Sequence, residues 1–217
     1  MNDAAISLDG WVMRVRQPIG EGFFPVILML HGWTGDENSM WVFAARLPRN
    51  AILVAPRGLY PAQGMPGYSW HPAIARPWPR LQDFQPAAEK IVELFSRRNF
   101  PSADTSRLHL LGFSQGSAFA YSITILHPGR VASLAGLSGF LPEGASQNLP
   151  GARLAALPVF IAHGIRDNHV PVDRARKSVQ LLQQAGAQVT YCEDDVGHKL
   201  SARCFHGLEA FYQQLRL

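Results

Sequence analysis

The sequence predicts an α/β fold, a three-layer sandwich in which a mostly parallel sheet lies between two layers of helices. The first observation is that short apolar runs rich in β-branched residues alternate with stretches of helical periodicity. The second is the length of 217 residues, which suits one domain and is not divided by a repeat, linker or low-complexity tract. Alternation of this kind favours parallel strands, because successive parallel strands need a crossover helix between them. We therefore expect residues 1–217 to form a single domain.

The strands are predicted from apolar runs that end at turn-forming residues. Residues 26–30, Val-Ile-Leu-Met-Leu, are fully apolar, which is typical of a strand buried on both faces. Residues 158–163 make a similar run that ends at Gly164. The predicted strands are 11–16, 26–31, 51–55, 107–112, 131–137, 158–163 and 187–192.

The helices are predicted from apolar residues that recur every three or four positions. Within 84–98 one apolar stripe is formed, and the charged residues lie elsewhere on the helix. A second stripe runs from Val172 to Leu182, and Gly186 ends that helix. The predicted helices are 38–46, 84–98, 115–126, 172–185 and 201–214.

Residues 56–80 interrupt the alternation with a long irregular segment. Such a segment is either a stiff surface excursion or part of a binding site, and we favour the second interpretation. Prolines would keep it rigid, and aromatic side chains offer apolar area to a ligand. We therefore expect it to form a wall of the substrate site. Its aromatic residues are Tyr60, Tyr68, Trp70 and Trp78.

Charge and composition exclude several kinds of partner. The formal net charge is +4, but the basic residues are scattered and only Arg97 and Arg98 are adjacent, which argues against nucleic acid. The sequence has no C-x-x-C or H-x-x-x-H pair and no glycine pattern for nucleotides, so no metal and no cofactor are expected. The expected partner is a small molecule, and monomer and homodimer both stay open.

Cysteine content and hydropathy indicate the compartment. Two cysteines are too few for a disulfide framework, so Cys192 and Cys204 are expected to be free, buried thiols. Asp3 and Asp9 interrupt any signal-like stretch near the first residue, and no apolar run is long enough to span a membrane. A soluble, cytoplasmic protein is the expectation.

Residues 112–116 read Gly-Phe-Ser-Gln-Gly, a G-x-S-x-G pattern between a predicted strand and a predicted helix. That pattern describes a serine on a sharp turn with its hydroxyl raised above the sheet edge. The five letters alone are a weak signal, but their place between strand and helix strengthens it. Ser114 is thus the candidate nucleophile.

A serine hydroxyl needs a base to take its proton and an acid to orient that base. In this topology the chain order should be serine, acid, histidine. Asp167 follows the strand at 158–163, and His198 follows the strand at 187–192, so both lie at a carboxyl end of the sheet. Asp194 and Asp195 compete for the role of the acid, and we favour Asp167 because it closes a strand of its own.

Backbone amides must stabilise the negative oxygen that forms when the hydroxyl attacks a carbonyl. One is expected from Gln115, directly after the serine, and the other from Trp33, in the loop after an early strand. His31 is expected to brace that loop rather than to act in catalysis. The expected substrate-pocket residues are Trp70, Phe140, Leu141 and Val170.

At this point the chain resembles the α/β-hydrolase fold, and within it the bacterial phospholipase/carboxylesterase family related to acyl-protein thioesterases. The matching pieces span nearly the whole chain in the family order: His31-Gly32 with Gly35, residues 55–58, residues 112–116, His163-Gly164 with Asp167, Val170 and Pro171, and Gly197-His198. The resemblance implies Ser114 as nucleophile, His198 as base, Asp167 as orienting acid, and the amides of Trp33 and Gln115 as oxyanion donors. Trp33 departs from the family, which often has a small aliphatic residue there.

The expected function is hydrolysis of carboxylic esters of short to medium acyl chains through an acyl-enzyme, with no cofactor. The resemblance also admits a lysophospholipid or a thioester as the substrate. Two other readings stay open: an acyltransferase that uses the same three residues, and a catalytically silent binding protein on the same fold.

Overall fold

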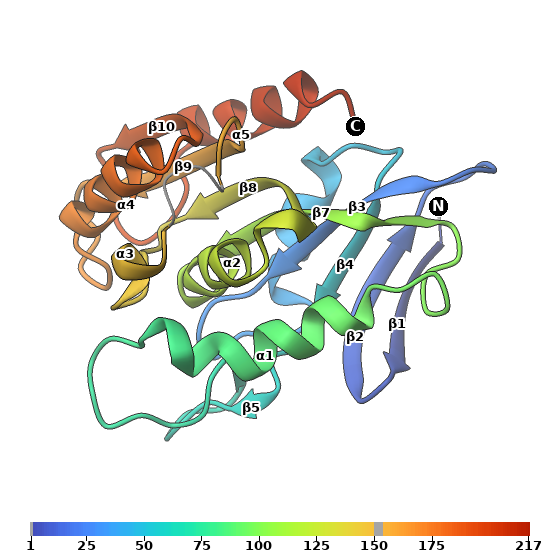
Figure 1. The fold of residues 1–217 in the computed structure, drawn as a ribbon, viewed down its shortest axis with the longest axis horizontal. Helices are drawn as coiled ribbons and strands as arrows, with labels where there is room; N and C mark the ends of the chain where they lie inside the picture. The colour runs from blue at the N-terminus through green and yellow to red at the C-terminus, as the bar shows by residue number, and fades with distance from the viewer. Residues whose placement is uncertain (1, 150–153) are drawn as a thin grey trace.

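The computed structural model describes residues 2–149 and 154–217, and it has the predicted α/β architecture (Figure 1). Its main sheet has eight strands in the order β1-β2-β4-β3-β7-β8-β9-β10. These strands are β1 (Asn2–Leu8), β2 (Trp11–Gln17), β3 (Phe24–Leu30), β4 (Ile52–Pro56), β7 (Ala103–Phe113), β8 (Val131–Leu137), β9 (Pro158–Gly164) and β10 (Gln188–Asp194). The helices are η1 (Ser39–Arg46, a 3-10 helix), α1 (Leu81–Leu94), α2 (Gln115–Leu126), η2 (Pro128–Arg130, also 3-10), α3 (Ala145–Asn148), α4 (Val172–Gln184) and α5 (Ala202–Gln214).

The six strands from β4 to β10 in this order are parallel, while β1 and β2 join antiparallel at one edge. Their register brings the carboxyl ends to one level. Leu30 of β3 pairs with Gly112, Phe113 of β7 pairs with Leu137, and Gly164 of β9 pairs with Asp194. The loops that follow these strands therefore meet along one edge, where open α/β sheets place their sites.

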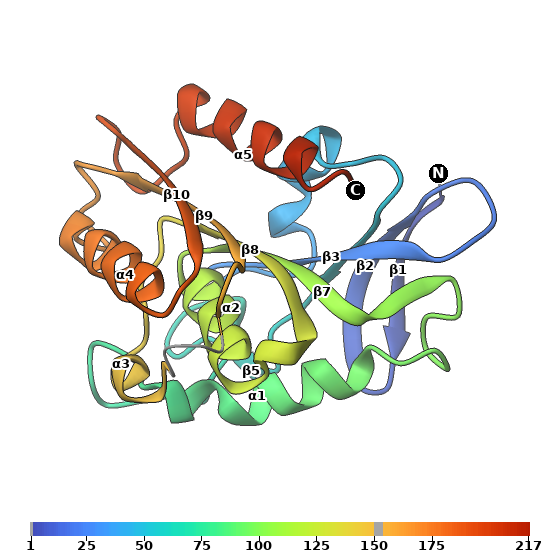
Figure 2. The same cartoon turned by 45° about the horizontal axis from the view of Figure 1, so that its top comes forward.

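Helices cover both faces of the sheet, as predicted (Figure 2). Residues of β3 show why, because alternate side chains of a strand point to opposite faces. Val26, Leu28 and Leu30 pack in a core with α1, α2 and α4. Ile27 and Met29 pack in a second core with η1 and α5. The fully apolar run at 26–30 is thus explained by burial on both sides.

Several boundaries differ from the predictions. β1 was not predicted, because it is an edge strand whose residues are mostly exposed and show no apolar alternation. α1 begins at Leu81, since the Asp83 carboxylate accepts the Arg80 N–H at 2.6 Å, and it ends before Phe95, which stacks on Phe100. The helix predicted at 38–46 is the 3-10 helix η1.

The segment 56–80 contains one short antiparallel pair, β5 (Tyr60–Pro61) with β6 (Tyr68–Ser69). Tyr68 also bridges to Gly35 in the loop after β3. The irregular segment is therefore joined to a loop at the carboxyl edge of the sheet. Within the described ranges, no helix is long and apolar enough to cross a membrane.

Candidate active site

Ser114 lies in the turn between β7 and α2. Its backbone angles are φ 54° and ψ −118°, a conformation that residues with a side chain rarely adopt. The Ser114 N–H donates to the Leu137 carbonyl at 2.8 Å, which anchors the turn to β8. Strained residues of this kind are concentrated at functional sites, where the surrounding structure holds them in place.

The glycines on either side of Ser114 are required by close backbone packing. A Cβ on Gly112 would lie 2.3 Å from the Gly116 carbonyl oxygen, and a Cβ on Gly116 would lie 2.0 Å from that of Leu30. Both distances are far too short for a side chain. The pattern at 112–116 thus reflects how closely α2 begins against β7 and β3.

Asp167 and His198 lie beside Ser114, although they are far from it in sequence. His198 Nε2 is 3.0 Å from Ser114 Oγ, and His198 Nδ1 is 2.7 Å from Asp167 Oδ2. Each of the three residues follows a different parallel strand, β7, β9 or β10. The arrangement joins a hydroxyl, an imidazole and a carboxylate in one line of hydrogen bonds, as activation of a serine nucleophile requires.

The Asp167 carboxylate is buried and fully hydrogen-bonded. Its Oδ1 accepts the N–H groups of His169 and Val170, each at 2.9 Å, while Oδ2 faces His198. Burial raises the pKa of Asp167, but the hydrogen bonds from Val170, His198 and His169 outweigh it, so the pKa lies below its usual value. The group is thus an anion that can hold one orientation of the His198 ring.

His163 lies beside Asp167 and supports it. Its Nε2 donates to the Val170 carbonyl at 2.8 Å, and because a carbonyl only accepts, this bond places the ring proton on Nε2. The same Nε2 lies 3.4 Å from Asp167 Oδ2. Burial lowers the pKa of His163, so the ring is neutral near pH 7. We did not assign it a role from the sequence, although its place in His163-Gly164, four residues before Asp167, was a usable signal.

The competing acids Asp194 and Asp195 pair with other residues. Asp194 Oδ2 is 3.2 Å from Arg203 Nε, and Asp195 Oδ1 is 2.7 Å from Arg166 Nε on the exposed surface. Both carboxylates therefore belong to surface ion pairs, whereas Asp167 holds the bond to His198.

The two expected oxyanion donors flank Ser114. Among the described residues, none accepts a hydrogen bond from the Trp33 N–H. Gln115 is the first residue of α2, where backbone N–H groups have no acceptor within the helix and the helix dipole favours negative charge. A Cβ on Gly32 would lie only 3.3 Å from Ser114 Cβ, so the loop that carries Trp33 passes close to the serine.

His31 braces that loop, as expected. Its ring is fully buried, its Nε2 accepts the Gly58 N–H at 2.9 Å, and its Nδ1 donates to the Gly32 carbonyl at 2.7 Å. Burial lowers the pKa of His31, which keeps the ring neutral. The loop after β3 is thereby tied to the start of the segment 56–80.

The Gln115 side chain makes a second tie that sequence reasoning did not find. Its Oε1 accepts the Trp70 N–H, and its Nε2 donates to Ser69 Oγ, each at 3.1 Å. The Trp70 indole in turn donates to the His31 carbonyl at 2.7 Å. One buried network therefore connects the start of α2, the segment 56–80 and the loop that carries Trp33.

A cavity of about 820 Å³ opens above Ser114. Gln115, His198 and Trp33 line it, and much of its wall comes from the segment 56–80, as the sequence analysis expected. Phe140 and Val170 also line it. The residues from the segment are Pro61, Gln63, Met65, Ser69, His71, Pro72, Ala73, Ile74, Arg76, Pro77, Trp78 and Pro79.

Two expected pocket residues do not line this cavity, and those predictions are corrected. Trp70 is fully buried and stacks between His31 and Phe119, with ring centroids 4.7 Å from each. Leu141 points into the core beside α4, and its N–H donates to Ser178 Oγ at 3.0 Å. An apolar residue next to a pocket can equally face the core, and the sequence does not distinguish the two.

Two residues of the cavity region were not predicted. His169 lines the cavity, and its ring lies 5.0 Å from the His198 ring. Arg174 of α4 places its guanidinium 3.5 Å from the ring centroid of Trp78, which holds that wall residue against the body of the protein. The position of His169, two residues after Asp167, could have indicated a place in the site. The contact between Arg174 and Trp78 could not have been predicted, because it forms between separate elements of the folded chain.

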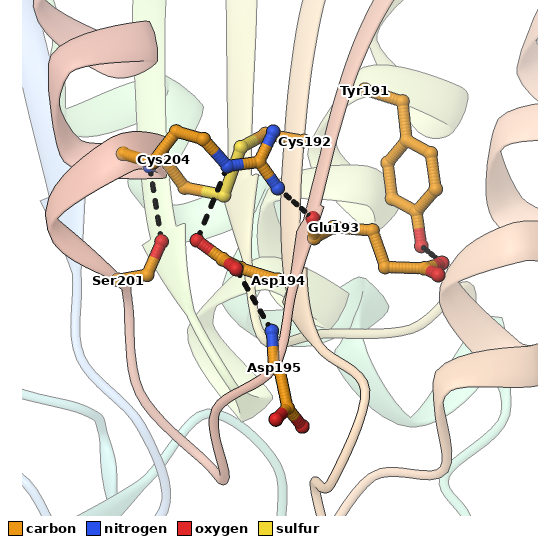
Figure 3. Close-up of a disulfide and its surroundings, with 8 residues drawn as sticks. Tyr191, Cys192, Glu193, Asp194, Asp195, Ser201 and Cys204 are labelled. Atoms are coloured by element: carbon orange, nitrogen blue, oxygen red, sulfur yellow. Dashed lines mark hydrogen bonds and ion pairs between the residues drawn. A yellow bond between two sulfur atoms is a disulfide. The ribbon is translucent and has the colours of Figure 1, made fainter.

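The two cysteines correct another expectation, because Cys192 and Cys204 form a disulfide rather than free thiols (Figure 3). The bond joins β10 to the first turn of α5. The count of cysteines argued only against a framework of several bridges, and the pairing depends on β10 and α5 lying side by side. No group of three or more potential ligands capable of holding a metal ion occurs among the described residues.

This chain is similar in sequence to proteins described as carboxylesterases and to a thioesterase. A probable carboxylesterase of Oryza sativa subsp. japonica is 28% identical over 129 residues, which are 58% of this chain and 48% of that protein. A probable inactive carboxylesterase of the same plant is 23% identical, over 80% of this chain and 78% of that protein. Acyl-protein thioesterase 1 of Saccharomyces cerevisiae is 26% identical, over 73% and 77%. The match to the first of these thus spans about half of its length.

The fold comparison covers the whole chain. A carboxylesterase from Mesorhizobium loti superimposes with a TM-score of 0.78 at 22% identity, covering 100% of this chain and 99% of that one. This likeness supports the α/β-hydrolase fold. The family model described as Phospholipase/Carboxylesterase matches residues 20–215, which include the whole candidate site. The chain belongs to the phospholipase/carboxylesterase family of α/β-hydrolases.

Proposed function

We propose that this protein is a serine hydrolase that cleaves carboxylic esters of short to medium acyl chains. The observation that carries the proposal is the line of hydrogen bonds from Ser114 Oγ through His198 to Asp167, at 3.0 and 2.7 Å. Family membership supports ester hydrolysis as the reaction class. One relative is described as a probable inactive carboxylesterase, so membership of the family does not by itself establish activity.

In the proposed mechanism, Ser114 Oγ attacks the ester carbonyl carbon while His198 Nε2 takes the hydroxyl proton. Asp167 holds the ring so that Nδ1 carries its own proton and Nε2 is free to accept. The Trp33 and Gln115 N–H groups donate to the oxygen that becomes negative. The intermediate then collapses to an acyl-enzyme as His198 gives its proton to the leaving alcohol, and water repeats the two steps to release the acid.

The walls of the cavity support an apolar acyl or alcohol portion. Trp33, Phe140 and Trp78 offer aromatic surface, and the prolines of the segment 56–80 stiffen the wall. The Trp33 side chain is 49% exposed and is therefore available to the substrate. The family often has a small aliphatic residue at this position. We propose that Trp33 limits the length of the chain that is accepted.

The test is hydrolysis of p-nitrophenyl esters of two to twelve acyl carbons, beside a lysophospholipid and an acyl thioester, with Ser114→Ala as the control. The expected result is turnover of the shorter esters that the control lacks. Preference for the thioester would instead favour the activity for which the yeast relative is named. Added alcohol or amine acceptors separate hydrolysis from acyl transfer, and failure of a fluorophosphonate to label Ser114 would favour a silent binding protein.

The cytoplasmic location and the homodimer are separate proposals that do not enter the mechanism. Cell fractionation and light scattering test them. The location also bears on the disulfide, because reducing compartments keep most thiols free.

A further inference from the structure

The three loops of the candidate site are unequally supported. Ser114 and Asp167 follow β7 and β9, which are internal strands paired on both sides. His198 follows β10, the last strand of the sheet, which pairs with β9 alone among the described strands. The residues of β10 are mostly half-buried, whereas β9 is buried almost throughout. His198 is therefore the member of the site with the weakest scaffold.

Backbone hydrogen bonds to the loop that carries Asp167 hold the first part of the His198 loop, which we define as residues 194–201. The Ile165 N–H donates to the Asp194 carbonyl at 2.8 Å, and the Arg166 N–H donates to the Val196 carbonyl at 3.0 Å. These bonds tie the beginning of the loop to the loop that carries Asp167. Beyond His198 the chain turns directly into α5, so the position of His198 also depends on where that helix begins.

The disulfide joins that beginning to β10. Cys192 lies on β10 and Cys204 in the first turn of α5, and His198 stands midway between them in sequence. Figure 3 shows the bond crossing from strand to helix, with Ser201 accepting the Cys204 N–H at 3.1 Å. The covalent link thus closes a short ring of chain around His198.

The other side-chain links between these elements lie at the surface, where Arg203 of α5 donates to the Glu193 carbonyl and pairs with Asp194. The Arg203–Asp194 distance is 3.2 Å, and the two side chains are 64% and 31% exposed. Exposed ion pairs contribute little, because water and salt screen them and both side chains must be ordered. Leu208 and Phe211 of α5 are buried in the core at least one turn further along the helix, whereas Phe205, next to Cys204, is half-buried and stacks on Phe43 of η1.

We propose that the Cys192–Cys204 disulfide positions His198 against Ser114 and Asp167, so that ester hydrolysis is fast only while the bond is intact; this inference rests on the proposed function. The two cysteines are positioning residues and do not touch the substrate. In a reducing environment the proposed esterase is slow, and in an oxidising one it is fast.

The experiment compares the oxidised protein with the same protein reduced by dithiothreitol. The reagent supplies two electrons and two protons, so the S–S bond is replaced by two thiols and the reagent becomes its cyclic disulfide. Cys192→Ser with Cys204→Ser gives a permanently open form. Kinetics are measured with p-nitrophenyl butyrate well below the melting temperature, together with hydrogen exchange of the amides of the His198 loop.

On reduction we expect kcat to fall on the order of 10- to 100-fold, because a small displacement of a reacting group is costly, with KM nearly unchanged. Exchange in the His198 loop should rise, reoxidation should restore kcat, and the double variant should be slow and indifferent to dithiothreitol. Asp194→Asn is the matched control: it removes the Arg203 pair but leaves the disulfide, and kcat should stay within about twofold.

Unchanged kcat after reduction, with the free thiols counted, would overturn the proposal even if the melting temperature fell, because the bond would then be merely structural. Unchanged exchange in the His198 loop would also overturn it, and this readout does not need activity. Absence of ester hydrolysis and of fluorophosphonate labelling in the oxidised protein would instead refute the proposed function, while the exchange result would still decide whether the bond holds the loop.

Discussion

Replacing Asp167 by Asn should nearly abolish ester hydrolysis by reversing the His198 tautomer. In the native site, Oδ1 accepts the His169 and Val170 N–H groups and Oδ2 accepts from His198 Nδ1. An asparagine keeps its single oxygen toward the two backbone donors, because its amide nitrogen cannot accept from them. The amide NH₂ then faces Nδ1, which must become an acceptor. His198 therefore carries its proton on Nε2, toward Ser114 Oγ, and cannot take the serine proton.

The size of the effect follows from what the tautomer controls. The corresponding Asp-to-Asn change in a comparable triad lowers kcat by about 10⁴. A factor of 10⁴ is about 5.4 kcal/mol of transition-state stabilisation. The two backbone bonds at 2.9 Å are what make the wrong orientation of the asparagine the favoured one here.

The assay is kcat for p-nitrophenyl butyrate, with circular dichroism to show that the variant is folded. Asp194→Asn and Asp195→Asn are the matched controls, since these carboxylates pair with Arg203 and Arg166, and both should stay within about twofold of the wild type. If Asp167→Asn kept a tenth of the wild-type rate, or if either control lost more than it did, the assignment of the orienting acid would be wrong.

Three further substitutions and one pH measurement test the site. Ser114→Ala should lower kcat by on the order of 10⁴–10⁶ with the fold intact, and a variant that kept substantial turnover would exclude Ser114 as nucleophile. Gly116→Ala places a Cβ 2.0 Å from a carbonyl oxygen of β3 and should lower the free energy of unfolding, measured by chemical denaturation, by about 3 kcal/mol. Gly129→Ala is the control and should lower it far less, because no atom lies within 4 Å of its Cβ. Equal losses in the two variants would contradict the packing argument. Gln115→Ala keeps its backbone N–H, so kcat should fall by less than the ~10²–10³ that an oxyanion donor is worth. Its unfolding free energy should nevertheless drop by about 1–3 kcal/mol, because a buried amide loses its acceptor. Finally, the pKa of Asp167 is lower in the folded protein than in the unfolded chain, so its contribution to stability is fully present above the unfolded pKa and is lost as pH falls through the folded pKa. The unfolding free energy should therefore decline less between pH 5 and pH 2 in Asp167→Asn than in the wild type. Parallel curves for the two proteins would refute the lowered pKa.

The order of elements and the residues of the candidate site could be predicted from the sequence because they depend on local patterns. Alternating strands and helices predicted the parallel sheet, and the carboxyl ends of parallel strands necessarily share one edge. Three polar residues, each placed just after its own strand, could therefore be expected to meet. Ser114, Asp167 and His198 do lie together, and His31 braces the loop after β3, as expected.

The inferences that failed depended on the direction of a side chain or on the neighbour of an element. Trp70 lies in the segment that forms the cavity wall, yet it faces the core, since its indole finds an acceptor at the His31 carbonyl. Leu141 faces the core as well. β1 is an exposed edge strand that only its pairing with β2 defines.

The sequence by itself determined the class of fold, the strand ends that carry the candidate residues and the family to which the chain belongs. Periodicity and turn residues are properties of contiguous chain, so they can be recognised before folding. Only the tertiary structure decided that Asp167 rather than Asp194 faces His198, that the Gln115 side chain joins two loops, and that Cys192 and Cys204 are bonded across the ends of the His198 loop. These contacts connect residues from separate elements, and packing of those elements in space is what brings their atoms within bonding distance.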